Sequence, residues 1–295
     1  MSLEIFQSTW AMEVRQPGKQ ELSLSEKCSL TAGSGFDGLN IDLDVEDMPP
    51  VLEVRDTLTD YGLACSVVAF PANVDELIVA LERCGVLDAT SLVVNARYFP
   101  FSVEQGGEFV ENCLATGREF GIPVHFETHR LTLTNDLLYT VQLLECCPDL
   151  RLVADLSHYV LGREMPIPVD GFHQELIERI LRRSVSIQGR IPSREQIQLP
   201  LHFPSNQDWV SQFYEWWEWG MKDWLSRSTI SPRSPSEIED NNRFNFTCEL
   251  GPSPYAMTDE NGVEFSDRWE EGLVLKREVE KTWQRCVIGS LGSES

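Results

Sequence analysis

The sequence has few basic residues. Its 24 lysines and arginines stand against 47 aspartates and glutamates, so the formal net charge is −23. Nucleic-acid phosphates repel a chain this acidic, because proteins that bind DNA or RNA neutralise phosphates with Lys and Arg. Anionic membrane surfaces repel it in the same way. We therefore expect neither a nucleic-acid partner nor a membrane partner.

Long apolar runs and cysteine motifs are also absent. No apolar run approaches the roughly 18 residues that a membrane span needs, and the first ten residues lack the basic and apolar regions of a signal peptide. The eight cysteines include no CxxC pair and lie mostly in apolar segments, where cysteine acts as a small hydrophobe. The sequence thus favours a reduced, cytoplasmic protein.

Short apolar runs rich in β-branched and aromatic residues recur along the chain, mostly about 30 residues apart, which is the length of one strand–helix unit. The expected strands are Ile5–Trp10, Gly38–Leu43, Ala64–Phe70, Ser91–Ala96, Pro123–Thr128, Leu150–Leu156, Val185–Gln188 and Asn245–Leu250. Segments with helical periodicity lie between them. Eight such units predict an α/β fold, a (β/α)₈ TIM barrel that forms a single domain over residues 1–295. An open doubly wound sheet is the alternative, but no GxGxxG follows the first strand.

Five of the eight tryptophans lie between the seventh and eighth expected strands, within Asp208–Leu225. Residues 199–243 are therefore interpreted as a Trp-rich helical insertion. Its aromatic face could pack on the barrel, on a second subunit of a homo-oligomer, or over the barrel mouth as a lid.

Carboxylates end three of the expected strands. Glu127, Asp155 and Glu249 each follow apolar strand residues, and chemistry in a TIM barrel lies at these carboxyl ends. Three buried carboxylates in one barrel mouth are unfavourable unless they are protonated or neutralised. A divalent cation is the simplest neutraliser, and oxygen ligands suit Mg²⁺ or Mn²⁺, whereas Co²⁺ or Zn²⁺ are further options.

The phrases VHFETH, LVADLSH and FTCELG resemble strands of the xylose-isomerase-like (AP endonuclease family 2) TIM-barrel superfamily, and specifically its sugar phosphate isomerases and epimerases. The likeness in order and spacing covers essentially the whole chain. Endonuclease four belongs to the same superfamily, but its zinc cluster uses more His ligands than this chain, with five histidines, can supply.

The resemblance implies a role for each matching residue. Glu127 and Glu249 become metal ligands that double as acid/base carboxylates, and Asp155 becomes a third ligand. Gln188 stands where the superfamily has a ligating His, which is a departure from its pattern. His158 and Arg194 become contacts to substrate oxygens.

Three further residues near strand ends are candidates for substrate binding. Trp10 could form an aromatic wall or pack in the core. His129 could contact substrate or belong to a salt-bridged loop, and Arg190 could bind an anionic substrate or balance the acidic mouth.

We therefore expect a metal-dependent isomerase or epimerase of carbohydrate metabolism that acts on a small polyhydroxy carbonyl compound through an enediolate. Two alternatives stay open. One is a metal-dependent lyase or dehydratase of the same superfamily, and the other is a metal-free barrel that acts as a binding subunit.

Overall fold

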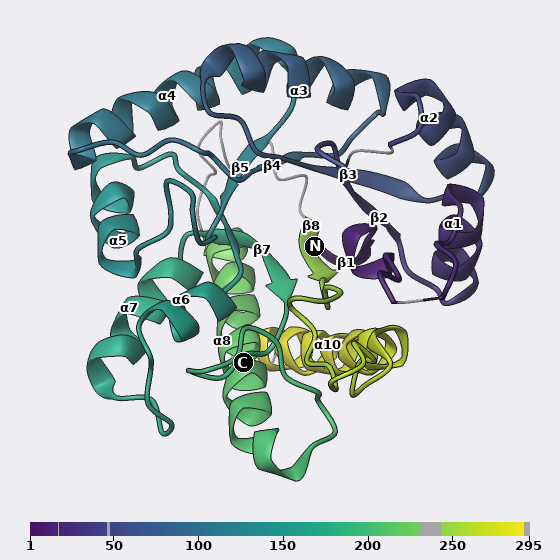
Figure 1. Cartoon of the computed structure of the whole chain (residues 1–295). Coiled ribbons are helices and arrows are strands. Elements are labelled where there is room, and N and C mark those ends of the chain that lie inside the picture. The colour runs from purple at the N-terminus through teal and green to yellow at the C-terminus, as the bar shows by residue number, and fades with distance from the viewer. Residues whose placement is uncertain (17, 46–47, 231–242, 292–295) are drawn as a thin grey trace.

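The computed structural model describes residues 1–16, 18–45, 48–230 and 243–291. Eight parallel strands close into a barrel, in which β1 pairs with both β2 and β8 (Figure 1). The strands are β1 Ser2–Ser8, β2 Gly38–Asp42, β3 Ala64–Ala69, β4 Leu92–Val94, β5 Val124–Glu127, β6 Leu152–Ala154, β7 Ser184–Gly189 and β8 Arg243–Cys248. The expected (β/α)₈ barrel is confirmed. That residues 1–295 form a single domain stays a prediction.

Helices connect successive strands and surround the barrel (Figure 1). They are α1 Leu24–Gly33, α2 Val51–Asp60, α3 Val74–Val86, α4 Val103–Phe120, α5 Leu137–Cys146, α6 Ser157–Gly162, α7 Gly171–Leu181, α8 Gln207–Ile230 and α10 Arg268–Leu291, with short 3₁₀ turns η1 Trp10–Met12 and η2 Pro204–Asn206. Among the described residues, no helix is both long and apolar enough to cross a membrane.

Polar side chains fix where several helices begin. The residues that precede α1, α3, α4, α5 and α7 each accept a hydrogen bond from a backbone N–H of the first helical turn; they are Ser23, Asn73, Ser102, Asp136 and Asp170. Such caps satisfy amide groups that have no partner within the helix. Each strand therefore passes into its helix at a position that the sequence specifies.

Strand residues alternate between the helices outside and the interior of the barrel. On β8, Phe244 and Phe246 face outward and contact helix α8. Inside the barrel, Val68, Val93 and Val153 form a small apolar cluster separate from the main core. Polar side chains lie above this cluster, at the carboxyl ends of the strands.

The Trp-rich helix α8 covers the outside of the barrel and lies between β7 and β8 in the chain. Trp217 lies 5.0 Å from Phe246 and Trp224 lies 5.5 Å from Phe244, measured between ring centroids. The Trp216 indole N–H donates to Gln174 Oε1 of α7, 2.8 Å away. The Trp216 side chain is 1% exposed. The helix thus packs on the barrel. It does not form a lid over the barrel mouth, which was one of the alternatives that the sequence allowed.

Two expectations about the insertion are not tested by the contacts of α8. Residues 231–242 lie outside the described residues. The homo-oligomer that the insertion suggested stays a prediction.

Candidate active site

The carboxyl ends of β5, β6 and β8 bring three carboxylates together. Glu127 is the last residue of β5, whereas Asp155 and Glu249 directly follow β6 and β8. One oxygen from each lies within 4.8 Å of the others, so the three could hold a metal ion. All three side chains are buried. The proximity expected from the strands of one parallel barrel is therefore present.

A buried arginine lies among these carboxylates. Arg190, directly after β7, places Nη2 2.5 Å from Glu249 Oε2 and 3.1 Å from Asp155 Oδ2. Its side chain is 1% exposed. The guanidinium also lies over two aromatic rings, 5.3 Å from the Trp10 centroid and 4.6 Å from that of Tyr255. Arg190 therefore supplies a positive charge inside the cluster.

Burial and neighbouring charges separate the proton affinities of the three carboxyl groups. Burial raises the pKa of Glu127 well above its usual range, and the charges of Glu249 and Asp155 raise it further. Burial also raises the pKa of Glu249 to about 7, although Arg190 acts in the opposite direction. Burial disfavours the charge of Asp155 too, but Arg190 and then His158 hold its pKa below the usual range. Asp155 is therefore the permanent anion, while the two glutamates can exchange protons.

Asn95 fixes the side chain of Glu127. It follows β4, and its Nδ2 group donates a hydrogen bond to Glu127 Oε2 over 2.8 Å. This bond favours the charged carboxylate and so lowers the pKa of Glu127, against the effect of burial. Asn95 thus orients the carboxyl group and moderates its proton affinity.

The rings of two histidines lie next to each other, tilted by 56°, beside the carboxylates. The ring centroids of His129 and His158 lie 4.1 Å apart, and His158 Nε2 is 3.4 Å from Asp155 Oδ2. Burial and then the neighbouring His158 lower the pKa of His129 to about 3, and burial lowers the pKa of His158 as well. Both rings are therefore neutral near pH 7 and can exchange hydrogen bonds with an oxygen-rich ligand. With Glu127 they form a second group that could hold a metal ion.

A pocket of about 260 Å³ opens onto this cluster. It is lined by Ser8, Trp10, Arg15, Asn40, Asp42, Val68, Phe70, Asn95, Glu127, His129, Arg190, Glu249, Pro254 and Tyr255. The structure thus brings Trp10, His129 and Arg190 to one cavity with both glutamates. Tyr255 was not expected from the sequence, because it lies in a loop seven residues beyond β8, where no periodicity indicates direction.

Gln188 and Arg194 were also expected in the site, but neither is among the residues that line the cavity. Gln188 is 1% exposed, and both its amide oxygen and its amide nitrogen lack a hydrogen-bond partner among the described residues. Arg194 is 45% exposed and pairs with Glu195 and Glu164 outside the pocket. The structure therefore brings Arg190 to the carboxylates and leaves Arg194 outside the residues that line the cavity.

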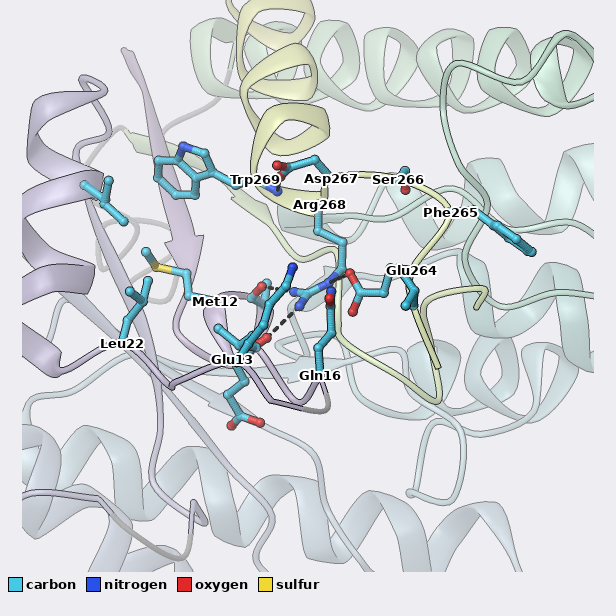
Figure 2. A pocket seen from close by; sticks show the side chains of 15 residues that line it. Met12, Glu13, Gln16, Leu22, Glu264, Phe265, Ser266, Asp267, Arg268 and Trp269 are labelled. Carbon is cyan, nitrogen blue, oxygen red and sulfur yellow. Dashed lines mark hydrogen bonds and ion pairs between the residues drawn. The ribbon is translucent and has the colours of Figure 1, made fainter. Parts of the chain in front are cut away.

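A larger pocket of about 550 Å³ lies nearby, between the loop after β1 and the loop before α10. Figure 2 shows the Arg268 side chain within it. Arg268 donates hydrogen bonds to the carbonyl oxygens of Ala11 and Glu13 and to the carboxylate of Glu264. These bonds tie together the two loops that follow β1 and β8. The hydrogen bonds of Arg268 therefore hold the loops of this pocket together. The acid/base groups lie in the cavity of about 260 Å³.

No family model matches the sequence, and no curated protein does. Solved structures do match. A structure of L-ribulose 3-epimerase is 11% identical with a TM-score of 0.63, covering 100% of this chain and 99% of that one. A xylose isomerase-like TIM barrel protein from Mycobacterium smegmatis in complex with magnesium is 14% identical with a TM-score of 0.61, covering 95% and 97%.

The probable 3-DHS dehydratase of Bacillus anthracis is 14% identical, with a TM-score of 0.52, over 92% of this chain and 98% of that one. Likenesses at such identities establish the fold. The expected resemblance to xylose isomerase-like barrels is therefore confirmed as a shared architecture.

Proposed function

We propose that this protein is an isomerase or epimerase that moves a proton on the carbon beside a carbonyl group of a small polyhydroxy compound. One observation carries the proposal. Glu127, at the end of β5, and Glu249, just after β8, both have a raised pKa and both line one cavity. Carboxyl groups tuned toward neutral pH are suited to take up and return protons.

The two carboxyl groups determine which reactions fit. If one glutamate removes a proton from one face of the carbon and the other returns a proton to the opposite face, the product is an epimer. If one glutamate carries the proton between neighbouring carbons, an aldose and a ketose interconvert. Both reactions pass through an enediolate, which needs positive charge or hydrogen-bond donors at its oxygens.

Other pocket residues supply binding and orientation. His129 and Asn95 offer hydrogen-bonding groups for hydroxyls, while Trp10 and Tyr255 form apolar walls. His158 packs against His129. A cavity of about 260 Å³ suits a small carbohydrate, in keeping with the sugar epimerases that share the fold.

The donor set fits a divalent ion. Glu127, Asp155 and Glu249 offer oxygens within 4.8 Å of one another, and the buried Gln188 amide oxygen has no other partner among the described residues. Such ligands suit Mg²⁺ or Mn²⁺ better than the nitrogen- and sulfur-seeking Zn²⁺, and Co²⁺ is intermediate. When bound, the ion would polarise the substrate carbonyl and stabilise the negative charge that develops on its oxygen.

Elimination is the second candidate reaction. The same proton abstraction leads to a lyase or dehydratase when the neighbouring carbon carries a leaving group, and a dehydratase shares the fold. The Trp-rich helix gives no support for a bulky aromatic substrate, because Trp217 and Trp224 pack on outward-facing side chains of β8 and no tryptophan of α8 lines the cavity. Elimination therefore rests on shared fold alone.

Proton exchange with solvent tests the proposal and does not require the product to be identified. The protein is incubated in D₂O with a panel of ketoses, aldoses and sugar acids, and loss of the proton next to the carbonyl is followed by NMR. We expect exchange on at least one compound with the unaltered protein and with Glu195→Gln, an exposed control. Glu127→Gln and Glu249→Gln should abolish it. Exchange that persists in both variants, or none across the panel, would overturn the proposal.

A further inference from the structure

Arg190 lies where a metal ion would bind. Its Nη2 group is 3.1 Å from Asp155 Oδ2 and 2.5 Å from Glu249 Oε2, and these are two of the three carboxylates that could hold an ion. We propose that Arg190 is a built-in cation that occupies this position and competes with a divalent ion for Asp155 and Glu249. The inference rests on the metal site of the proposed function.

Burial makes the competition direct. Arg190 and Asp155 are 1% and 0% exposed, so neither charge can exchange its partner for water. Buried charges persist only when they are paired. A divalent ion that takes the oxygens of Asp155 and Glu249 must therefore remove them from the guanidinium, which then needs another place.

The surroundings hold the guanidinium in position. It lies over the rings of Trp10 and Tyr255, a favourable arrangement for a cation. At the preceding residue, Gly189, a Cβ atom would overlap the ring of Phe246, so the backbone is fixed just before Arg190. The following residue, Ile191, is buried. Arg190 is thus a packed component of the site.

Gln188 shifts the balance further toward the arginine. It stands on β7, two residues before Arg190, and its amide oxygen is neutral and has no partner among the described residues. A neutral amide attracts a divalent ion less than a charged carboxylate does. The ion therefore gains little at Gln188 to offset what it must break at Arg190.

Two of the nitrogen atoms of Arg190 have no hydrogen-bond partner among the described residues. They are Nε and Nη1, and the residue lines the pocket. Both groups are buried, so a substrate oxygen can reach them only when a neighbouring side chain of the pocket moves. The charge that an ion would present to the substrate is thus already present in the protein.

Binding of Mn²⁺ alone tests the inference. Full-length protein is stripped with chelator, and free Mn²⁺ is measured by electron paramagnetic resonance during a titration at pH 7.5. Arg190→Met removes the charge and keeps much of the side-chain length. We expect this variant to bind Mn²⁺ at least about tenfold more tightly than the unaltered protein. Arg194→Met, a control that removes an exposed arginine of the same loop, should leave the affinity unchanged.

Added guanidinium provides a second measurement. In Arg190→Ala, which leaves space for a free guanidinium ion, millimolar guanidinium should weaken Mn²⁺ binding, whereas it should have no effect on the unaltered protein. Circular dichroism verifies that both variants are folded. Equal or weaker Mn²⁺ binding by Arg190→Met would overturn the inference.

A crystal structure of the unaltered protein with saturating Mn²⁺ decides the matter if the variants do not fold. We expect Arg190 to leave Asp155 and Glu249 when the ion binds there. An ion held by these carboxylates while both ion pairs to Arg190 persist would overturn the inference. None of these measurements uses a substrate, so their failure is distinguishable from failure of the proposed reaction.

Discussion

Gly251 lies so close to the ring of Trp10 that a Cβ atom at position 251 would overlap the six-membered part of the indole. The indole in turn lies 5.3 Å from the Arg190 guanidinium and meets Tyr255 edge-on at 4.9 Å. The absence of a side chain just after β8 therefore sets the position of the aromatic wall, and with it the position of the buried arginine.

Gly251→Ala should displace Trp10 and destabilise the protein. Overpacking of this kind costs about 1–3 kcal/mol, and we expect that loss in the free energy of unfolding measured in urea by circular dichroism. Gly85→Ala is the control, because Gly85 lies within α3 with no atom near its missing Cβ. Equal stabilities of Gly251→Ala and the unaltered protein would show that Trp10 has room to move.

Asn95→Ala should move the pH profile of the reaction. The hydrogen bond from Asn95 favours ionised Glu127, so its loss raises the pKa of that carboxyl group further. If ionised Glu127 is the base, the acid limb of the kcat/KM profile shifts to higher pH. Asn112→Ala, on the exposed face of α4, should leave the profile in place. A fall in kcat with no shift in the limb would argue that Asn95 acts only on geometry.

Glu249 should make the protein less stable as the pH rises. Its pKa is raised from 4.5 to about 7, so the folded state holds a proton that the unfolded state releases above pH 4.5. This contribution to stability is complete below pH 4.5 and disappears as the pH rises through about 7, at no more than about 1.4 kcal/mol per pH unit. Urea denaturation between pH 5 and 8 measures the change.

Glu249→Gln provides the comparison, because the amide does not titrate. The free energy of unfolding of the unaltered protein should fall relative to that of this variant up to about pH 7 and then run parallel to it. A constant difference across the range would mean that Glu249 titrates alike in the folded and unfolded states.

Trp217→Ala should strongly destabilise the barrel. The side chain is 1% exposed and packs on Phe246 of β8, and the loss of such a ring costs about 3–5 kcal/mol. Trp217→Phe should cost less, since its indole N–H has no hydrogen-bond partner among the described residues. The control is Trp219→Ala on the same helix, where the ring is only half-buried. Thermal unfolding followed by calorimetry ranks the three variants.

The sequence predicted those parts of the site that lie on strands. Glu127, Asp155 and Glu249 end parallel strands of one barrel, and such ends meet at one rim, so their proximity followed from strand order. Arg190 and Arg194 both follow β7, where neither pleat nor helical period specifies direction. The burial of Arg190 depends on side-chain packing against Trp10 and Tyr255, which no spacing in the sequence encodes.

The Trp-rich segment was interpreted as an addition to the barrel because the seventh interval is about twice the usual length. The structure supports this interpretation in part, because the 24-residue helix α8 between β7 and β8 carries a cluster of aromatic contacts. Its aromatic side chains fill the space between the barrel wall and helix α10, where Trp224 meets Trp283. The sequence predicted that the segment is helical and rich in tryptophan, but the surface on which its aromatic side chains pack depends on contacts that the interval length does not specify.

The distribution of tryptophans has an optical consequence. Five of the eight lie on α8, the helix that covers the barrel wall, whereas Trp10 lines the pocket of about 260 Å³. We therefore expect tryptophans of α8 to contribute most of the intrinsic fluorescence. A ligand that reaches the carboxylates should quench only a small fraction of the total signal, while loss of the barrel core should shift nearly all of it.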